Sequence, residues 1–516
     1  MSESREAGRG DDGPAIVGVD VGSSSIKAVA FDARGRKLAA ASRRTPMIPM
    51  ATGGEYHPDE IFDAALAVLA EIGRDLGGRP VAGIAATGIG ESCVLVDDAG
   101  RAVSSSIAWF DRRTVPEAAE IAARIGIERL FALTGVGPEF SFTLAKLLWM
   151  RKHWGEALGR ARRVLMMADW IAFRLSGIAA SDPTLAARTQ YYDIARHEWS
   201  AELLALAGFE PRFPAPLRKG GTALGPVKPE VLAEAGLAGK PVVGVGGHDH
   251  IVAAMACGLH RPGTLVDSMG TAEPLLLGTA GPLHDLDAIR RGYLQGPIEP
   301  GRLFWVGGSL FTSGGAIEWV RALTGGADQA TLIAEAADVP PGSGGVVFVP
   351  HVGNGVSPPN ADPDARGAFL GLTTGTGRGE LYRAVLEGLA MQARLILDGM
   401  TGLPGVAPPT GPPCLTGGGS RNRLLVEIKA NVYGRPVTVV DEPESTALGA
   451  ALLGGVAAGL YPDIESAVAG LERRDAVVKP DPALAARYDA LRETVFARTP
   501  AALRPLDAAL AGWRTG

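Results

Sequence analysis

The residue whose setting most clearly suggests chemistry is Asp249, in the run Gly246-Gly-His-Asp249-His250. The apolar segment 241–245 before it is expected to be a buried strand, and small apolar residues favour a helix over 251–257. A carboxylate at a strand end can accept the proton of an attacking hydroxyl group that comes within hydrogen-bond reach. The same position also suits the N-cap of the following helix, so the local sequence leaves both interpretations open.

Two glycine turns carry hydroxyl residues behind an acid. The first is Asp20-Val-Gly-Ser-Ser and the second is Asp267-Ser-Met-Gly-Thr. Backbone N–H groups in such turns form concavities that bind phosphate oxygens. The residues that could hold nucleotide phosphates are Ser23, Ser24, Lys27, Gly270 and Thr271. Asp20 could hold a hydrated Mg²⁺, although each turn taken alone could also be an ordinary hairpin.

A third glycine run, Thr416-Gly-Gly-Gly-Ser-Arg-Asn422, follows a strand and precedes a helix expected over 423–433. A nucleotide can lie across bare backbone at such a place, and a simple strand-to-helix turn is an equal alternative. His248 and His250 flank Asp249, but two histidines on a strand-to-helix turn are more often polar neighbours than metal ligands. The interpretation without a transition metal is therefore favoured.

These residues lie on alternating strands and helices. The expected order is strands at 15–20, 26–31 and 37–41, a helix at 58–76 and a strand at 81–87. The same order begins again near Arg261, and the likeness of the two turns suggests an internal duplication. Helices are also expected over 379–400 and along the tail, 481–513. Such alternation is typical of an α/β layer fold.

Length and composition narrow the class of protein. A chain of 516 residues is long enough for two large domains. Its 46% apolar and 21% charged residues are those of a globular protein, and a net charge of −6 favours neither nucleic acid nor anionic lipid. The apolar segment 446–461 is shorter than the roughly 20 residues of a membrane span and is expected to be a buried helix.

The cysteines and the N-terminus indicate where the protein works. Cys93, Cys257 and Cys414 are odd in number and widely spaced, so neither a disulfide framework nor a zinc site is predicted. Residues 1–13 are polar and lack the apolar core of a secretory signal, and are expected to form a disordered lead-in. A cytoplasmic protein is therefore expected.

The order of these motifs, from Ile16 to about Leu460, resembles the FGGY family of carbohydrate kinases. The two glycine turns are similar to the family's phosphate motifs. Ser313-Gly-Gly-Ala-Ile-Glu-Trp319 is similar to a segment whose glycine touches nucleotide phosphate. Gly417-Gly-Gly-Ser-Arg-Asn422, followed by Glu444-Ser-Thr-Ala-Leu-Gly-Ala450, resembles the adenosine motif. Two further segments, Thr87-Gly-Ile-Gly-Glu91-Ser and Trp109-Phe-Asp111-Arg-Arg113, look like the substrate loops.

The resemblance implies an α/β fold of two actin-like (ribonuclease H-like) domains facing a central cleft. Residues 14–258 would form the N-terminal domain, with the substrate and the base, and residues 259–516 the C-terminal domain, with the nucleotide. It assigns Asp249 as catalytic base, and Asp20 with Asp249 to Mg²⁺. Its nucleotide residues are Ser23, Ser24, Lys27, Gly270, Thr271, Gly314, Gly418, Gly419 and Asn422, and its substrate residues are Glu91, Trp109, Asp111 and Asp249.

The expected activity is ATP-dependent phosphorylation of a small sugar or polyol, foremost a ketopentose such as xylulose, with glycerol, erythritol or another polyol as alternatives. Glu91 is more like glycerol kinases, but they precede it with Arg where this chain has Gly90, and xylulokinases commonly have Met-His at these positions. The tyrosine contact of glycerol kinases also lacks a counterpart within 139–143. An alternative of another class is an actin-like ATP-binding, chaperone-type protein. The resemblance also leaves room for a homodimer.

Overall fold

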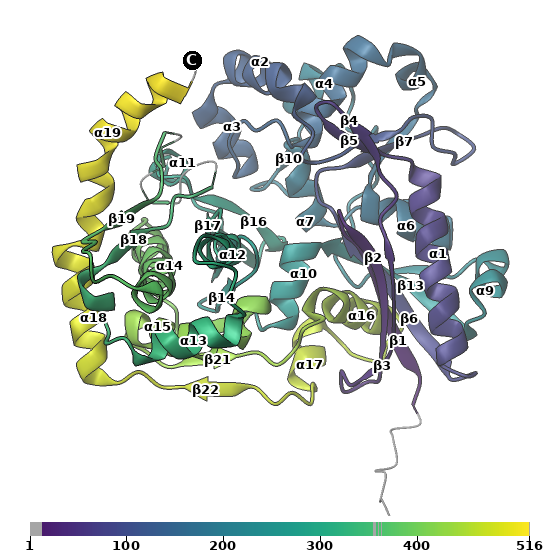
Figure 1. Ribbon diagram of the computed structural model, residues 1–516. Helices are drawn as coiled ribbons and strands as arrows, with labels where there is room; N and C mark the ends of the chain where they lie inside the picture. Colours follow the sequence, from purple (N-terminus) through teal and green to yellow (C-terminus); the bar gives the residue numbers. More distant parts are fainter. Residues whose placement is uncertain (1–12, 354–357, 360, 363, 515–516) are drawn as a thin grey trace, which may run out of the picture. The chain divides into compact units, whose positions relative to one another are not determined.

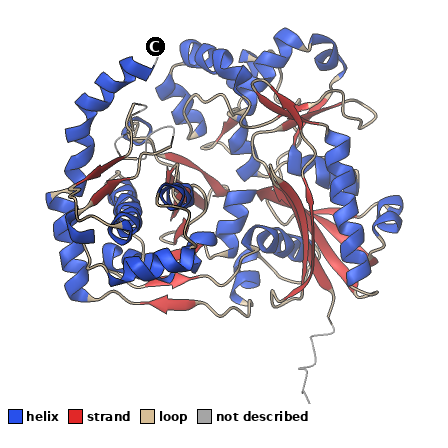
Figure 2. Cartoon of the chain, viewed as in Figure 1, coloured by secondary structure: helices blue, strands red, loops and turns tan. Residues whose placement is uncertain are grey.

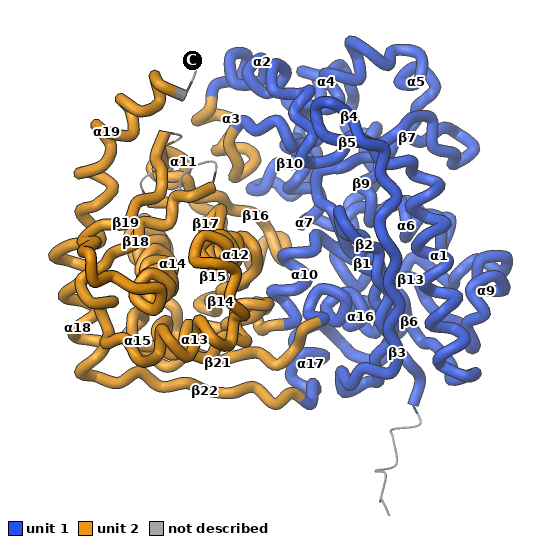
Figure 3. Tube along the Cα trace, in the orientation of Figure 1, with its two compact units in different colours: residues 1–126, 138–256, 444–472 blue, residues 127–137, 257–443, 473–516 orange. Residues whose placement is uncertain are grey.

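A computed structural model describes residues 13–353, 358–359, 361–362 and 364–514 (Figure 1). The expected lead-in, 1–13, lies outside the described residues except for Gly13. The chain forms two compact units (Figure 3). Unit 1 comprises Met1–Gly126, Pro138–Ala256 and Glu444–Glu472, and unit 2 comprises Ile127–Gly137, Cys257–Pro443 and Arg473–Gly516. The chain therefore passes between the units several times.

The described part of unit 1 is built on a sheet with the strand order β12-β13-β6-β1-β2-β3. The strands are β1 (Ala15–Val21), β2 (Ser25–Phe31), β3 (Lys37–Arg44), β6 (Pro80–Gly88), β12 (Ala223–Pro226) and β13 (Ala238–His248). The antiparallel run β1-β2-β3 confirms the predicted three-strand opening. Strands β6 and β13 lie parallel to β1, so the carboxyl ends of these three strands meet at one edge of the sheet.

Two helices cover the faces of this sheet (Figure 1). Helix α1 (Pro58–Asp75) begins with proline in its first turn and buries Ile61, Val68 and Ile72 at helical spacing. On the other face, α16 (Ser445–Ala457) packs directly on the backbone. A Cβ on Gly18 would lie 1.8 Å from the Ala447 carbonyl oxygen. This close approach requires glycine, and it explains why 444–472 belongs with unit 1.

Further helices of unit 1 carry polar residues of the candidate site that is described below. They are α4 (Thr143–His153), α7 (Pro183–Ala186), η2 (Ala187–Thr189) and α10 (Asp249–Ala256), and α6 (Met167–Ser176) is another helix of this unit. Helix α10 begins two residues earlier than predicted, so Asp249 is its first residue. Asp249 therefore lies where β13 ends and α10 begins.

The described part of unit 2 contains a sheet with the order β16-β17-β15-β14-β20-β21-β22. Its strands are β14 (Leu265–Ser268), β15 (Glu273–Thr279), β16 (Leu294–Glu299), β17 (Leu303–Leu310), β20 (Cys414–Thr416), β21 (Val437–Val439) and β22 (Ala476–Val478). Four antiparallel strands, β16-β17-β15-β14, are followed by the parallel strands β20 and β21 and the antiparallel edge strand β22, so the sheet repeats the pattern of unit 1 with one additional antiparallel strand. This shared arrangement is what the predicted internal duplication requires.

Helices α12 (Gly314–Leu323), α14 (Arg378–Thr401) and α15 (Arg423–Tyr433) pack in unit 2 (Figure 2). Helix α14 confirms the prediction for 379–400 and is buried along most of its length. The helical tail is also confirmed, as α18 (Pro482–Thr494) and α19 (Thr499–Arg514) joined by a short 3-10 turn. Within the described ranges, no helix combines the length and the apolar character that crossing a bilayer requires.

Candidate active site

The first glycine turn joins β1 to β2 and is closed by a hydrogen bond from Gly22 N to the Ser25 carbonyl oxygen, at 3.0 Å. The Trp109 indole N–H donates to Ser23 Oγ over 2.9 Å. Ser23 and Ser24 line a pocket of about 560 Å³ together with Arg44, Thr45, Pro46, Met47 and Phe110. The turn and the first residue of the predicted substrate loop are therefore in direct contact.

Asp20 and Lys27 are cross-strand partners at the end of β1. Burial and the nearby charge of Asp249 raise the pKa of Asp20 to about 7, against the opposing effect of Lys27. The Lys27 ammonium lies 2.6 Å from Glu444 Oε2, and the lysine side chain is 32% exposed. Asp20 and Asp249 are thus close enough to repel each other's charge, an arrangement that a bound cation would relieve.

Asp249 occupies the carboxyl end of β13, where the backbone is held by its neighbours. Thr87 Oγ1 donates to the Gly247 carbonyl oxygen at 2.8 Å, and His248 N donates to Thr184 Oγ1 at 2.8 Å. The Asp249 Oδ1 atom accepts the N–H of His250 at 2.6 Å. Burial raises the pKa of Asp249, partly offset by His250. A carboxyl with a raised pKa at a rigid strand end has the properties of a general base.

Glu91, after β6, is fixed at both its side chain and its backbone. The Arg188 Nε and Nη2 atoms lie 2.8 and 2.5 Å from Glu91 Oε1. The backbone carbonyl oxygen of Glu91 accepts from Thr143 Oγ1 at 3.1 Å and from Lys146 Nζ at 2.9 Å. Lys146 is wholly buried, and this burial lowers its pKa to about 8. The position of the Glu91 carboxylate is therefore set by the surrounding fold.

The two strand ends that carry Glu91 and Asp249 come together at Gly90. An added Cβ on Gly90 would lie 2.4 Å from His248 Cδ2 and 2.9 Å from Arg188 Cγ. The His248 Nε2 atom lies 3.3 Å from Asp249 Oδ1. Burial holds the pKa of His248 well below its usual range. Glu91, Arg188, His248 and Asp249 thus form one cluster in unit 1.

Trp109 and Asp111 of the predicted substrate loop have different environments. The Trp109 side chain is among the exposed large apolar groups of the described chain, at 41%. Asp111 is 0% exposed, and Arg113 bonds to both its carboxylate oxygens. Asp111 Oδ2 also accepts from Gly54 N at 2.9 Å. Trp109 is therefore accessible to a ligand, whereas the Asp111 carboxylate holds the loop together.

In unit 2, backbone hydrogen bonds join the second glycine turn to the other two nucleotide segments. Gly314 N donates to the Gly270 carbonyl oxygen at 3.0 Å, and Ser313 N donates to that of Thr271 at 2.8 Å. Gly419 N donates to the Met269 carbonyl oxygen at 2.8 Å. The structure thus brings together the predicted nucleotide residues of this unit, which are far apart in the sequence.

A cluster of buried charged side chains is bonded to one of these segments through Ser313. The Lys429 ammonium lies 2.5 Å from both Asp267 Oδ2 and Glu273 Oε1, and all three side chains are 0% exposed. Tyr433 donates to Asp267 Oδ2 at 2.7 Å, and Ser313 donates to Glu273 Oε2 at 2.5 Å. Burial and the charge of Asp267 raise the pKa of Glu273 to about 7. This cluster ties β14, β15 and α15 to the residue that precedes Gly314.

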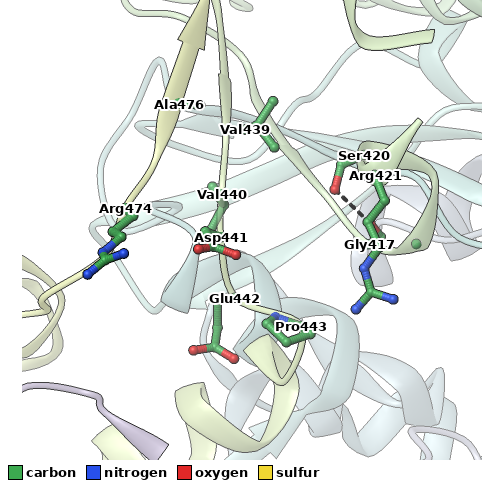
Figure 4. A pocket seen from close by; sticks show the side chains of 11 residues that line it. Gly417, Ser420, Arg421, Val439, Val440, Asp441, Glu442, Pro443, Arg474 and Ala476 are labelled. Atoms are coloured by element: carbon green, nitrogen blue, oxygen red, sulfur yellow. Dashed lines mark hydrogen bonds between the residues drawn. The ribbon is translucent and has the colours of Figure 1, made fainter. Parts of the chain in front are cut away.

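The third glycine run lines a pocket of about 380 Å³ in unit 2 (Figure 4). Gly417 and Gly418 form part of its wall, and no atom lies within 4 Å of an added Cβ on Gly418. Figure 4 shows Arg421 and Arg474 on either side of Asp441. The pocket's remaining residues are Ser420, Val439, Val440, Glu442, Pro443 and Ala476. Bare backbone beside a cavity suits the flat base or sugar of a nucleotide.

Asn422 is not among the residues that line this pocket. It is buried, and its Oδ1 caps α15 by accepting the N–H of Leu425 at 3.2 Å. Gly419 also contacts Met269 and not the pocket. Gly419 thus supports the predicted nucleotide segment through its backbone N–H, and Asn422 does so through its side-chain cap of α15.

Several residues of the site were not predicted from the sequence. Arg188 is not among the predicted site residues, and His248 was interpreted as a polar neighbour. Lys146, Glu273 and Lys429 carried no motif. A lysine within an otherwise apolar helical segment is a signal that could have identified Lys146, because lysine is almost never fully buried without a polar partner.

Two α/β units with acids, hydroxyls and glycines at their strand ends are the architecture of a phosphotransferase that handles nucleotide phosphates. The chain belongs to the FGGY family of carbohydrate kinases: residues 15–256 match the family's N-terminal domain and residues 265–458 its C-terminal domain. The resemblance seen in the sequence is confirmed. The chain is therefore an enzyme of the carbohydrate kinase class, and the chaperone-type alternative loses its support.

Individual relatives include kinases of two substrates. The glycerol kinase of Gloeobacter violaceus is 32% identical, over 88% of this chain and 90% of the relative. The xylulose kinase of Bacillus subtilis is 24% identical, over 92% of this chain and 95% of the relative. The solved xylulose kinase of Rhodospirillum rubrum is 30% identical, with a TM-score of 0.85 over 96% of this chain and 100% of that one. The likeness confirms the α/β fold of two actin-like domains.

Proposed function

We propose that this enzyme transfers the γ-phosphoryl group of ATP to a hydroxyl group of a small sugar or polyol, with Asp249 as the general base. The observation that carries the proposal is the cluster of Asp249, Glu91 and Arg188 at the strand ends of unit 1. A carboxyl with a raised pKa accepts a proton from the acceptor hydroxyl as phosphoryl transfer begins. The fixed Glu91 carboxylate accepts a hydrogen bond from a second hydroxyl of the substrate.

The nucleotide contacts follow from the same chemistry. Ser23, Ser24 and Lys27 hold phosphate oxygens from unit 1, and Gly270, Thr271 and Gly314 do so from unit 2. The pocket beside Gly417 and Gly418 takes the adenosine, with Gly419 and Asn422 holding its wall. Transfer requires that the γ-phosphoryl group reach the acceptor hydroxyl near Asp249.

Mg²⁺ is the metal that this chemistry requires. No group of three or more His, Cys, Asp and Glu side chains in the described residues is arranged to hold a metal. Mg²⁺ is usually held by one or two carboxylates together with phosphates and water, and Asp20 and Asp249 provide two carboxylates whose mutual repulsion a cation would relieve. When bound, the ion would neutralise charge on the transferred phosphoryl group. Asp20 and Asp249 fit this role.

For the substrate, we propose a ketopentose such as xylulose, with glycerol or another polyol as the alternative. Trp109, which is exposed beside the first glycine turn, provides an apolar wall for the carbon chain. Asp111, which is buried and bonded to Arg113 and Gly54 N, holds the loop that carries Trp109. Both xylulose and glycerol kinases among the relatives support a short polyhydroxylated acceptor.

The test is Asp249→Asn, which removes the base but keeps the size of the side chain. We expect ADP affinity to stay within about twofold while acceptor-dependent ADP release falls by about 100-fold or more. Xylulose, ribulose, erythritol and glycerol would be compared as acceptors. His250→Asn is the matched control, since the His250 side chain is 63% exposed and lies 4.0 Å from Asp249 Oδ1. Near-normal turnover by Asp249→Asn would refute the assignment.

A further inference from the structure

The space beside Gly90 is already filled by His248. An added Cβ on Gly90 would lie 2.4 Å from His248 Cδ2 and 2.7 Å from His248 Nε2. Contacts below 3.0 Å are essentially never seen for real Cβ atoms, so any side chain at residue 90 would have to displace the imidazole ring and, to a smaller extent, Arg188, whose Cγ lies 2.9 Å from the added atom. The absence of a side chain at residue 90 therefore has a local cause, and its larger part lies in the residue next to Asp249.

His248 is held firmly on its other sides. Its backbone N–H donates to Thr184 Oγ1 at 2.8 Å, and Thr184 Oγ1 in turn bonds to the Asp182 carboxylate. The side chain is only 10% exposed. The ring is therefore buried between Gly90 and the Asp249 carboxylate.

The two contacts on Asp249 fall on the same oxygen. His250 N lies 2.6 Å and His248 Nε2 lies 3.3 Å from Asp249 Oδ1. No described residue donates a hydrogen bond to Oδ2. A carboxylate held at one oxygen presents the other in a fixed direction, which is what a base needs to meet an acceptor hydroxyl.

We propose that His248 is a positioning residue for Asp249, and that Gly90 is the counterpart that makes room for it. The inference rests on the proposed role of Asp249 as the base. His248 packs against Gly90 and keeps Oδ1 turned toward itself, so that Oδ2 faces the acceptor. Gly90, which departs from the pattern of related kinases, is thereby linked to His248, the residue that precedes Asp249. The pair sets the direction of the reacting carboxylate and, through it, which acceptor hydroxyl is reached.

The test is a double-mutant cycle with Gly90→Ala, His248→Gly and the double variant. Gly90 does not need a positive φ, so Gly90→Ala introduces only the steric clash. We expect each single variant to lower kcat by about 10- to 100-fold, because a misplacement of about 1 Å costs this much. The double variant should lose little more than His248→Gly alone, since the two shortest contacts disappear with the ring and only the contact with Arg188 Cγ at 2.9 Å remains.

Additional measurements separate positioning from folding. ADP affinity should be unchanged in every variant, because the adenosine pocket of unit 2 contains none of these residues. His248→Asn, which keeps a smaller polar side chain beside Asp249 Oδ1, should recover part of the kcat lost in His248→Gly, with little change in the KM for the acceptor. His284→Asn, which changes an exposed histidine of unit 2, should behave as the wild type.

The outcomes distinguish the inference from the function on which it rests. Additive losses in the double variant, or wild-type kcat in both single variants, would overturn the role of the pair while leaving Asp249 as the base. A parallel loss of ADP binding and kcat would also overturn it, because the residues would then support only the fold. Retained turnover in Asp249→Asn would instead reject the proposed function itself.

Discussion

Asp20 in unit 1 and Asp267 in unit 2 occupy equivalent places, each at the end of the strand that lies between its sheet's antiparallel and parallel halves. Their surroundings are opposite. No described residue donates a hydrogen bond to the Asp20 carboxylate, and the nearby Lys27 is paired with Glu444. Asp267 is wholly buried and bonded to Lys429 and Tyr433. One acid is available to a ligand, and the other belongs to the protein's own structure.

The difference shows how one arrangement of strands can support two tasks. Each unit has one carboxyl group with a pKa near 7. In unit 1 it is the strand-end acid, Asp20, whereas in unit 2 it is Glu273, which lies beside the strand-end acid Asp267. At Asp20 the raised pKa comes from burial and an acid that shares its site, which a metal ion can correct. At Glu273 it comes from burial with Asp267 around a single lysine. Unit 2 therefore holds the segments proposed to bind the nucleotide by a sealed cluster, while unit 1 leaves the carboxylates of Asp20 and Asp249 without a buried cation of their own among the described residues.

The largest expected effect is that of Lys429→Met. Removing the ammonium group leaves Asp267 and Glu273 buried without their cation, and breaking a buried pair in this way costs about 3–5 kcal/mol. The free energy of unfolding of unit 2, measured in urea, should fall by this amount, and ADP affinity should fall with it.

The matched rescue is the triple variant Lys429→Met/Asp267→Asn/Glu273→Gln, which removes all three charges together. It should recover most of the lost stability, because no uncompensated charge remains in the core. A loss below about 1 kcal/mol in Lys429→Met would mean that the cluster is not a sealed structural unit, and the contrast with Asp20 would disappear.

The next effect concerns pH. The pKa of Glu273 is about 7 in the folded chain against an ordinary 4.5, so the native state keeps this proton where the unfolded chain has lost it. Stability should therefore fall as the pH rises from 4.5 to about 7. Glu273→Gln cannot ionise, so its stability relative to the wild type should increase across this window, on the order of 1–3 kcal/mol. Urea unfolding at several pH values measures this difference.

Glu318→Gln is the control for this experiment. Glu318 lies on α12, its side chain is 58% exposed, and it pairs with Arg321 at the surface. Its pH dependence of unfolding should follow that of the wild type. If the difference in the free energy of unfolding between Glu273→Gln and the wild type does not change with pH, the prediction is wrong. Lys429 would then compensate the charges of both carboxylates fully.

Much of this arrangement could be predicted because it depends on neighbours in the chain. The three opening strands, helix α1 and helix α14 follow from apolar periodicity, and the two turns follow from their glycine and hydroxyl residues. Asp249 was identified because its position after a buried strand is visible locally. The family resemblance then gave the order of the motifs.

The remainder depends on contacts between residues far apart in the sequence, which no local pattern contains. Lys27 and Glu444 are 417 residues apart, and Glu91 and Arg188 are 97 apart. The place of 444–472 in unit 1 depends on glycines such as Gly18, which allow α16 to touch the sheet. The burial of Asp111 was likewise hidden, because a Trp-x-Asp-x-Arg pattern does not show which side chains face the solvent.

The smallest effect on stability is expected for Lys27, and it is the sharpest test of the contrast between the two turns. Its ion pair with Glu444 is partly exposed, so Lys27→Met should change the free energy of unfolding by less than about 1 kcal/mol. If Lys27 holds nucleotide phosphate, the KM for ATP should nevertheless rise about tenfold, which corresponds to about 1.4 kcal/mol.

Glu444→Gln provides the comparison, because it releases the lysine without removing its charge. We expect this variant to bind ATP at least as tightly as the wild type, since the free ammonium no longer has to leave a carboxylate. If both variants weaken ATP binding equally, the pair acts as a structural unit, and the first turn resembles the second more closely than Asp20 suggests.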